Sequence, residues 1–158
     1  MTDTIVVRAA VMTDINVLIE FNAAMALETE HKVLDPAVLS AGVAAVIAEP
    51  KRGFYLVAEH EREVVGCLMI TYEWSDWRNG DWWWFQSVYV RPDYRRHGVF
   101  RRLYDEVEHL AKARPDVVGL RLYVERDNVH AQRTYEALGM SDSGYRLYAK
   151  AYNPHAAG

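Results

Sequence analysis

The sequence predicts an α/β or α+β protein built on a mixed β-sheet. Two kinds of pattern recur along its 158 residues. Short apolar runs bounded by turn residues indicate strands, and apolar residues three and four positions apart indicate helices. In chain order these elements read β-α-α-β-β-β-α-β-α-β. Strands that follow one another directly, and then a strand–helix–strand crossover, predict both antiparallel and parallel pairing in one sheet.

The amino-terminal part is predicted to hold one short strand, over 5–8, and two helices. Thr13 is a suitable N-cap for a helix that continues to about residue 27, because a threonine hydroxyl accepts from the first helical amides. Pro36 lies where a second helix, over 36–48, is expected to begin, because proline fits the first helical turn.

Three successive strands are expected next, over 54–59, 64–73 and 82–90. Asn79-Gly80 separates the last two, and both residues tolerate a positive φ, so the dipeptide predicts a hairpin turn. The remaining elements are a helix, a strand, a helix and a strand, expected over 98–113, 117–125, 128–138 and 145–152.

Length and composition predict a single globular domain over residues 1–158. The chain is 51% hydrophobic and 25% charged, and a chain of this size buries about two-thirds of its unfolded surface. Cys67 is the sole cysteine, so no internal disulfide forms and a reducing, cytoplasmic location is expected. No apolar run is long enough to cross a membrane, and residues 1–4 lack the basic start of a secretory signal.

Charge is unevenly distributed along the chain. The formal net charge is −4, which argues against general binding to nucleic acid. Residues 1–81 carry 6 basic against 13 acidic side chains, whereas residues 82–158 carry 12 against 9. The basic half is suited to an anionic ligand and the acidic half to a cationic one, although ordinary scatter of surface charge also accounts for the acidic half.

The stretch from Val90 to Phe100 is the most informative part of the chain. An apolar strand ends at Val90, an arginine-rich turn follows, and a helix is expected to start at Gly98. The first amides of a helix have no partner within it and lie at the positive end of its dipole, so they bind phosphate oxygens. The sequence therefore predicts a site for a phosphorylated cofactor.

Two segments carry a resemblance to a known family. Residues 95–100, Arg-Arg-His-Gly-Val-Phe, resemble the Arg/Gln-x-x-Gly-x-Gly/Ala motif that binds acyl-CoA in the GCN5-related N-acetyltransferase (GNAT) superfamily. Residues 128–135, followed by Gly139-Met140, are similar to the family's Asn-x-x-Ala-x-x-x-Tyr…Gly-Phe segment, at the spacing that the family uses. The resemblance covers roughly residues 82–140.

The resemblance implies a GNAT fold, with a mixed sheet of about six to seven strands, about four flanking helices and a splay between strands 4 and 5. It implies acetyl-CoA-dependent N-acetylation, by direct transfer to a primary amine of a small molecule or peptide. The pantetheine arm is expected to pair with the backbone around 86–90, where an amide near Tyr89 or Val90 polarises the thioester carbonyl. The expected coenzyme-binding residues are Ser87, Val88, Tyr89, Val90, Arg95, Arg96, His97, Gly98, Val99, Phe100, Asn128, Ala131 and Tyr135.

Phe100 departs from the family motif, which has glycine or alanine at this position. A helical side chain can point away from a ligand, so binding is still expected, with Gly98 leaving the backbone open to the phosphates. Arg95 also has a simpler interpretation, as a solvated surface residue.

Tyr135 matches the tyrosine that protonates the leaving thiolate in many members of the family. That role suits a phenol, whose ordinary pKa is about 10, and a core tyrosine is the alternative interpretation. Asn128 is expected to cap its helix, with or without a contact to pantetheine. Ala131 either leaves room for the cofactor or is simply a good helix former.

The general base is harder to assign. The predicted strand over 82–90 contains no carboxylate, whereas several family members have a glutamate there. Gln86 orients a substrate or water but does not keep a proton. Glu28, Glu30 and Glu73 are therefore the candidates for a proton relay through water. Each also fits a solvated side chain, and Glu28 stands four residues before Lys32, as in a helix-surface ion pair.

Five tryptophans gather around the predicted hairpin, namely Trp74, Trp77, Trp82, Trp83 and Trp84. Strand alternation places Trp82 and Trp84 on one face of the sheet and Trp83 and Phe85 on the other. One face is expected to enter the core. The other forms an aromatic wall beside the substrate or a homodimer contact, with core packing as the plainer alternative.

Partners and cofactors follow from these observations. No metal is expected, because the six histidines show no ligand spacing and have no cysteine partner. The acceptor is expected to be a cationic amine, and neither nucleic acid nor a membrane is expected as a partner. A second hypothesis stays open: a non-catalytic acyl-CoA-binding or regulatory module on the same fold, motivated by Phe100 and by the missing carboxylate.

Overall fold

A computed structural model describes residues 4–154 of the chain. The chain divides into two compact units, one ending at Leu122 and the other beginning at Tyr123, and each is described by itself. Among residues 4–154, every helix is too short or too polar to cross a membrane.

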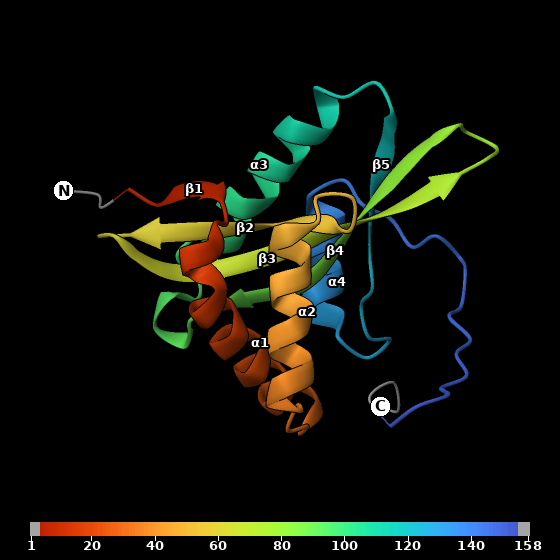
Figure 1. Cartoon of the computed structure of the whole chain (residues 1–158). Coiled ribbons are helices and arrows are strands. Elements are labelled where there is room, and N and C mark those ends of the chain that lie inside the picture. Colours follow the sequence, from red (N-terminus) through yellow and green to blue (C-terminus); the bar gives the residue numbers. More distant parts are fainter. Residues whose placement is uncertain (1–3, 155–158) are drawn as a thin grey trace. The chain divides into compact units, whose positions relative to one another are not determined.

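The first unit contains a five-stranded sheet in the order β1-β2-β3-β4-β5 (Figure 1). The strands are β1 (Val6–Ala9), β2 (Gly53–His60), β3 (Glu63–Ser75), β4 (Gly80–Val90) and β5 (Val117–Leu122). Strands β1 to β4 pair antiparallel, and β5 pairs parallel to β4. The mixed sheet predicted from the element order is therefore confirmed, and the β3–β4 hairpin extends beyond the helices of this unit.

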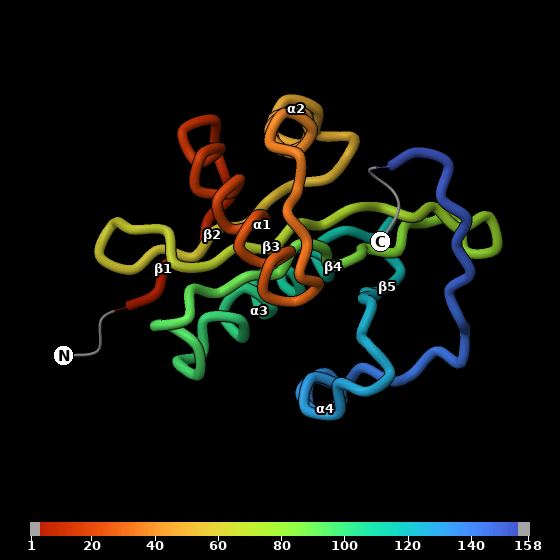
Figure 2. Tube along the Cα trace, turned by 90° about the horizontal axis from the view of Figure 1, so that it is seen from below, coloured from red at the N-terminus to blue at the C-terminus, as the bar shows by residue number. Residues whose placement is uncertain are grey.

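Helices cover both faces of this sheet. Figure 2 shows α1 (Ile15–Glu30) and α2 (Pro36–Ala48) on one face and α3 (Val99–Lys112) on the other. The remaining helices are the 3-10 turns η1 (Met12–Asp14) and η2 (Pro92–Tyr94) and, in the second unit, α4 (Val129–Ala137). Helix α2 begins where the sequence predicts, because the Asp35 carboxylate accepts from the amide of Ala37 at 2.9 Å and Pro36 fills the first turn.

The two sheet faces bury different side chains. Under α1 and α2 the core consists of Leu18, Phe21, Val43, Tyr55, Val57, Cys67 and Tyr89. On the other face Phe85 stacks on Tyr104 of α3, with ring centroids 5.6 Å apart. Burial raises the pKa of the Cys67 thiol to about 12. Cys67 is thus a small buried apolar residue.

The expected strand over 145–152 is wrong, and with it the expected number of six to seven strands. In the second unit residues 145–152 form no regular element. Tyr145, Tyr148 and Tyr152 are each more than 80% exposed. An alternating apolar pattern makes a strand only where a neighbouring strand supplies hydrogen bonds and a surface to pack against. The strand predicted over 117–125 likewise ends earlier, at Leu122.

A charged cluster fixes the entry to α1. The Arg8 guanidinium donates to both carboxylate oxygens of Asp14, at 2.7 and 2.9 Å, and also to Glu59 of β2. The amide of Val11 donates to the same Asp14 carboxylate. Asp14 is only 5% exposed, and its hydrogen bonds to Arg8 hold its pKa below the usual range.

Replacing Asp14 by asparagine is expected to lower the free energy of unfolding by about 1–3 kcal/mol at neutral pH, because it leaves Arg8 without its bidentate partner. The lowered pKa means that this stabilisation is present above the unfolded-state pKa, about 4, and is lost as pH falls through the folded-state value. Denaturant unfolding from neutral to acidic pH measures it, and the two proteins should converge in acid. Asp105→Asn, in an exposed ion pair with Arg101, is the control and should change stability by less than about 0.5 kcal/mol.

Candidate active site

The sheet of the first unit opens along the second half of β4. Strand β5 pairs with β4 from Asp81 to Phe85 and ends at Leu122, which is opposite Phe85. Residues 86–90 of β4 therefore extend beyond the last pair with β5. The splay predicted for strands 4 and 5 is present, and it begins at Gln86, directly after the last pair.

A β-bulge lies in this open half. In the β3–β4 register Cys67 is opposite Tyr89 and Met69 is opposite Gln86, so two residues, Ser87 and Val88, face one residue of β3. Ser87 has a φ of 51°, in the left-handed region. The extra residue reverses the alternation beyond it. Tyr89 consequently packs on Phe21 of α1, with ring centroids 4.9 Å apart.

The arginine-rich turn joins the open half of β4 to α3. It passes through η2, and Arg96 and Gly98 both have positive φ, of 66° and 78°. Gly98 is the N-cap of α3, and Arg96 and His97 are exposed beside it. The first amides of α3 have no acceptor within the helix. The local geometry can thus bind an anion at the positive end of α3.

Phe100 lies along the surface of its own helix. Its ring faces that of Tyr104, one turn further on, with centroids 6.2 Å apart. A Cβ added at Gly98 would meet nothing within 4 Å. The bulky residue at the third motif position therefore leaves the turn at Gly98 open.

Glu28, Tyr89 and Arg95 come together although they are far apart in sequence. Arg95 Nη2 donates to Glu28 Oε2 at 2.8 Å, and the hydroxyl of Tyr89 donates to Glu28 Oε1 at 3.4 Å. Burial, and then the nearby Glu28 carboxylate, raise the pKa of Tyr89. The expected Glu28–Lys32 helix pair does not fit the backbone, because α1 ends at Glu30 and the next residue is left-handed.

The other two candidate carboxylates lie elsewhere in the first unit. Glu30 is exposed at the last position of α1. Glu73 of β3 accepts from Trp84 Nε1 at 3.0 Å and from Arg121 Nη1 at 2.8 Å. The Arg121 guanidinium also lies over the ring of Trp82, 3.9 Å from its centroid.

The tryptophans divide between the two faces as alternation predicts. Trp83 and Phe85 are buried, and Trp83 packs edge-on against Phe54. Trp82 and Trp84 are half-buried on the other face, together with Glu73 and Arg121. Sequence reasoning missed the contacts that Arg121 makes on this face. The available signal was strand alternation, which puts Arg121 and Gly119 on the same face of the predicted strand because they are two residues apart.

In the second unit, Asn128 caps α4 as predicted. Its side-chain oxygen accepts from the amide of Ala131 at 3.1 Å. The side chain of Gln132 donates to the carbonyls of Glu125 and Arg126 and closes the preceding loop. Burial raises the pKa of Tyr135 above its ordinary value, so its phenol stays protonated at neutral pH.

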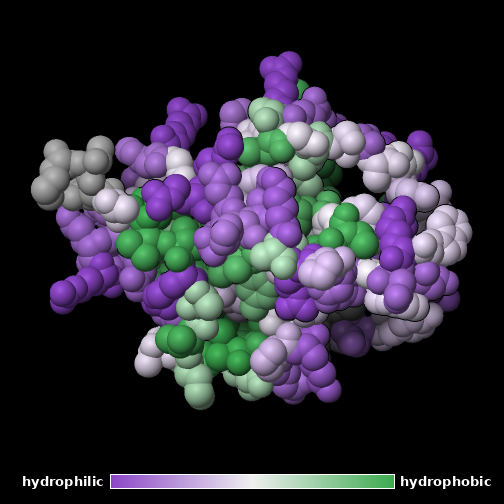
Figure 3. All heavy atoms as spheres, turned by 90° about the horizontal axis from the view of Figure 1, so that it is seen from above, coloured by the Kyte–Doolittle hydropathy of each residue, from purple (hydrophilic) through white to green (hydrophobic). Residues whose placement is uncertain are grey.

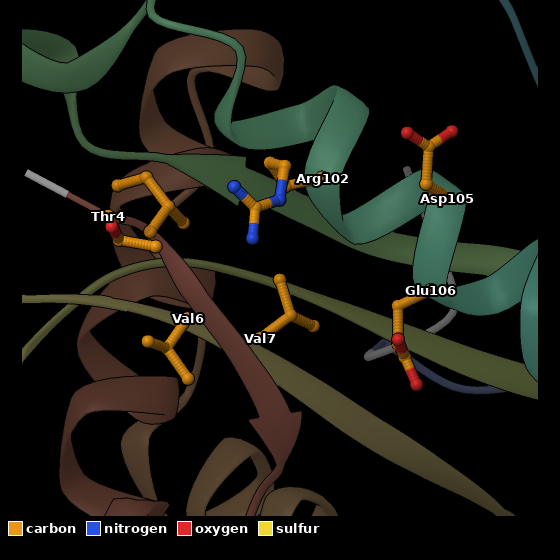
Figure 4. A pocket seen from close by; sticks show the side chains of 7 residues that line it. Thr4, Val6, Val7, Arg102, Asp105 and Glu106 are labelled. Atoms are coloured by element: carbon orange, nitrogen blue, oxygen red, sulfur yellow. The ribbon is translucent and has the colours of Figure 1, made fainter. Parts of the chain in front are cut away.

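A separate pocket of about 330 Å³ lies between β1 and α3 (Figure 4). Residues 4–7 line one side, and Arg102, Asp105 and Glu106 line the other. On the face shown in Figure 3, hydrophobic residues gather in patches with hydrophilic residues between them. None of the predicted site residues lines this pocket. Within residues 4–154, no group of three or more His, Cys, Asp or Glu side chains could hold a metal ion.

Replacing Gly98 by alanine is expected to cost about 1 kcal/mol of folding free energy, because its positive φ disfavours a side chain even where space is open. The control is Gly42→Ala in α2, where space is also open but the backbone is helical. That change should stabilise the protein by about 0.5–1 kcal/mol. Denaturant unfolding measures both, and equal effects would contradict the assignment of strain to Gly98.

Comparisons with known proteins agree with this geometry. Residues 23–140 match the model of the acetyltransferase (GNAT) family. The crystal structure of a possible acetyltransferase from Clostridium difficile 630 is 42% identical, with a TM-score of 0.88, over 94% of this chain and 98% of that one. No curated protein sequence matches.

Two more distant structures share the fold. A predicted acetyltransferase with acetyl-CoA from Clostridium acetobutylicum is 18% identical, with a TM-score of 0.77, over 93% of this chain and 96% of that one. An aminoglycoside N-acetyltransferase in complex with CoA is 12% identical, with a TM-score of 0.76, over 96% and 97%. The family match covers well over half of the residues and includes the open strand, the turn and α4. The chain belongs to the acetyltransferase (GNAT) family.

Proposed function

We propose that this protein is an acetyl-CoA-dependent N-acetyltransferase that transfers acetyl directly to a primary amine. One observation carries the proposal: the open half of β4 leads, through η2, to a turn at the start of α3 whose amides suit an anion. An extended, polyanionic thioester such as acetyl-CoA needs both features, a free strand edge and a phosphate site. Family membership supports acetyl transfer, and the proposal adds that the acceptor is a primary amine.

The coenzyme would use backbone more than side chains. Residues 87–90 offer the strand edge for the pantetheine arm, and the bulge at Ser87 re-aims the amides that follow it. The first amides of α3, with Arg96 and His97 beside them, suit the pyrophosphate. The acetyl-CoA and CoA present in two similar structures support this choice of donor.

Proton transfer needs a donor and an acceptor. Tyr135 is the proposed donor to the leaving thiolate, and its raised pKa keeps the phenol protonated until it acts. The acceptor amine must arrive without its extra proton or lose it to a carboxylate through water. Glu28, Glu30 and Glu73 are the candidates, and only Glu28 contacts the open half of β4, through Tyr89.

A cationic small molecule or peptide amine is the proposed acceptor. The negative charge of residues 1–81 supports it, since Glu28, Glu30 and Glu73 all lie in this half. An exposed carboxylate attracts an ammonium group before the proton is lost.

Calorimetry with acetyl-CoA tests the donor half of this proposal, and free-thiol release with a panel of amines tests the acceptor half. The panel comprises polyamines, aminoglycosides, amino acids and peptides with free amino-termini. Saturable acetyl-CoA binding and amine-dependent thiol release are expected. Absence of binding at millimolar acetyl-CoA would sink the proposal. Binding without thiol release from any amine would favour the non-catalytic module.

Tyr135→Phe is expected to lower kcat by about a hundredfold or more, because it removes the proton donor. The Kd of acetyl-CoA should stay within about twofold. Tyr135 acts in its protonated form, and burial raises its pKa above the ordinary value of about 10. Loss of this proton should therefore lower the wild-type kcat only above that pH. Steady-state kinetics against pH measure this. Tyr145→Phe, at an exposed tyrosine of the same unit, is the control and should retain the wild-type kcat.

A further inference from the structure

The side chain of Arg95 joins three elements at the end of the open half of β4. Its Nε donates to the carbonyl of Val90, the last residue of β4, at 2.8 Å. Its Nη2 donates to Glu28, in the last turn of α1, at 2.8 Å. Its guanidinium carbon lies 5.4 Å from the centre of the Tyr89 ring. The backbone of Arg95 itself belongs to the turn before α3.

Stability alone does not account for this arrangement. The side chains of Arg95 and Glu28 are 44% and 40% exposed, and an exposed ion pair contributes about 0–1 kcal/mol. Orientation is the larger effect. A planar guanidinium that donates to two fixed acceptors at once has little rotational freedom, and it transmits that constraint to its partner. The Glu28 carboxylate is thereby held at a defined place beside the open half of β4.

Arg95 is the principal partner of Glu28 in this cluster. The contact from the Tyr89 hydroxyl, at 3.4 Å, is near the upper limit for a hydrogen bond, whereas the 2.8 Å contact from Arg95 has the length of a charge-assisted one. Each oxygen of the Glu28 carboxylate therefore accepts one hydrogen bond, Oε1 from Tyr89 and Oε2 from Arg95. Since a carboxylate accepts about four hydrogen bonds, Glu28 keeps the capacity to accept from an ammonium group.

We propose that Arg95 is a positioning residue for acceptor binding: it ties the coenzyme-binding turn to Glu28 and holds that carboxylate where the amine must approach the open strand. This inference rests on the proposed function and adds to it the residue that engages the acceptor. Arg95 and Arg96, which are neighbours in the turn, then have different roles. Arg96 remains a residue for the coenzyme phosphates, whereas the guanidinium of Arg95 serves the amine side of the site.

The proposal makes Arg95 and Glu28 act as one unit on the amine. Loss of either member should raise the KM of the amine by about tenfold, the effect of about 1.4 kcal/mol. Loss of both should raise it no further, because each acts through the other. The Kd of acetyl-CoA should stay within about threefold in Arg95→Gln and Glu28→Gln. Arg95→Lys keeps the charge but reaches one acceptor at a time, so it should restore part of the wild-type KM.

The experiment measures acetyl-CoA binding by calorimetry, and steady-state kinetics with the panel amine that has the highest kcat/KM for the wild-type protein. Glu28→Gln, Arg95→Gln, Arg95→Lys and the double Gln variant are compared. Glu49 and Arg52 provide a matched control, because their ion pair has the same 2.8 Å length and similar exposure at the end of α2. The control variants, Glu49→Gln and Arg52→Gln, should retain the wild-type amine KM. Thermal unfolding verifies that every variant is folded.

The possible outcomes are distinct. A raised amine KM in both single variants, without further loss in the double variant, supports the proposal. An unchanged amine KM, or purely additive losses, overturns it while leaving the proposed function intact. A tenfold rise in the acetyl-CoA Kd of Arg95→Gln, with an unchanged amine KM, makes Arg95 a phosphate ligand instead. A wild-type protein that releases no thiol with any amine overturns the proposed function, and this inference with it.

Discussion

The hydrogen-bonded pairing of β4 with β5 stops at Phe85 and Leu122, and the proposed chemistry of the first unit depends on that stop. A fully paired β4 would be an ordinary interior strand with no backbone group available to a ligand. Because the pairing ends halfway, the same strand is anchored in the core at Trp83 and Phe85 and is open beyond them. A buried anchor and a strand edge that is not paired with β5 thus lie within the eleven residues of one element.

The bulge at Ser87 determines which side chains surround this edge. Without the extra residue, Tyr89 would share the face of Phe85 and pack against α3. With it, Tyr89 lies against Phe21 under α1, and its hydroxyl reaches the end of that helix at Glu28. The backbone distortion therefore connects the strand edge with the acidic end of α1. A local irregularity in one strand links two elements that are distant in sequence.

Local signals in the sequence were sufficient for much of the fold. The start of α2 follows from Pro36, the cap of α4 from Asn128, and the turn at Gly98 from the only glycine between β4 and α3. Features that depend on long-range pairing were not predictable in this way. The contact between Glu28 and Arg95 spans 67 residues, and the register shift at Ser87 depends on β3. The strand expected over 145–152 failed for the same reason, because alternation describes one strand and not its neighbour.

The burial of Cys67 has a practical consequence for chemistry at sulfur. The single cysteine of the chain lies fully inside the core under α1 and α2, and its pKa is raised to about 12. A thiol-reactive dye requires an accessible thiolate, so the folded protein should not react with the dye. Any colour that develops in a mixture with a thioester would then come from the released coenzyme and not from the protein. The same thiol would react once the core opens, so that one residue also reports loss of the folded state.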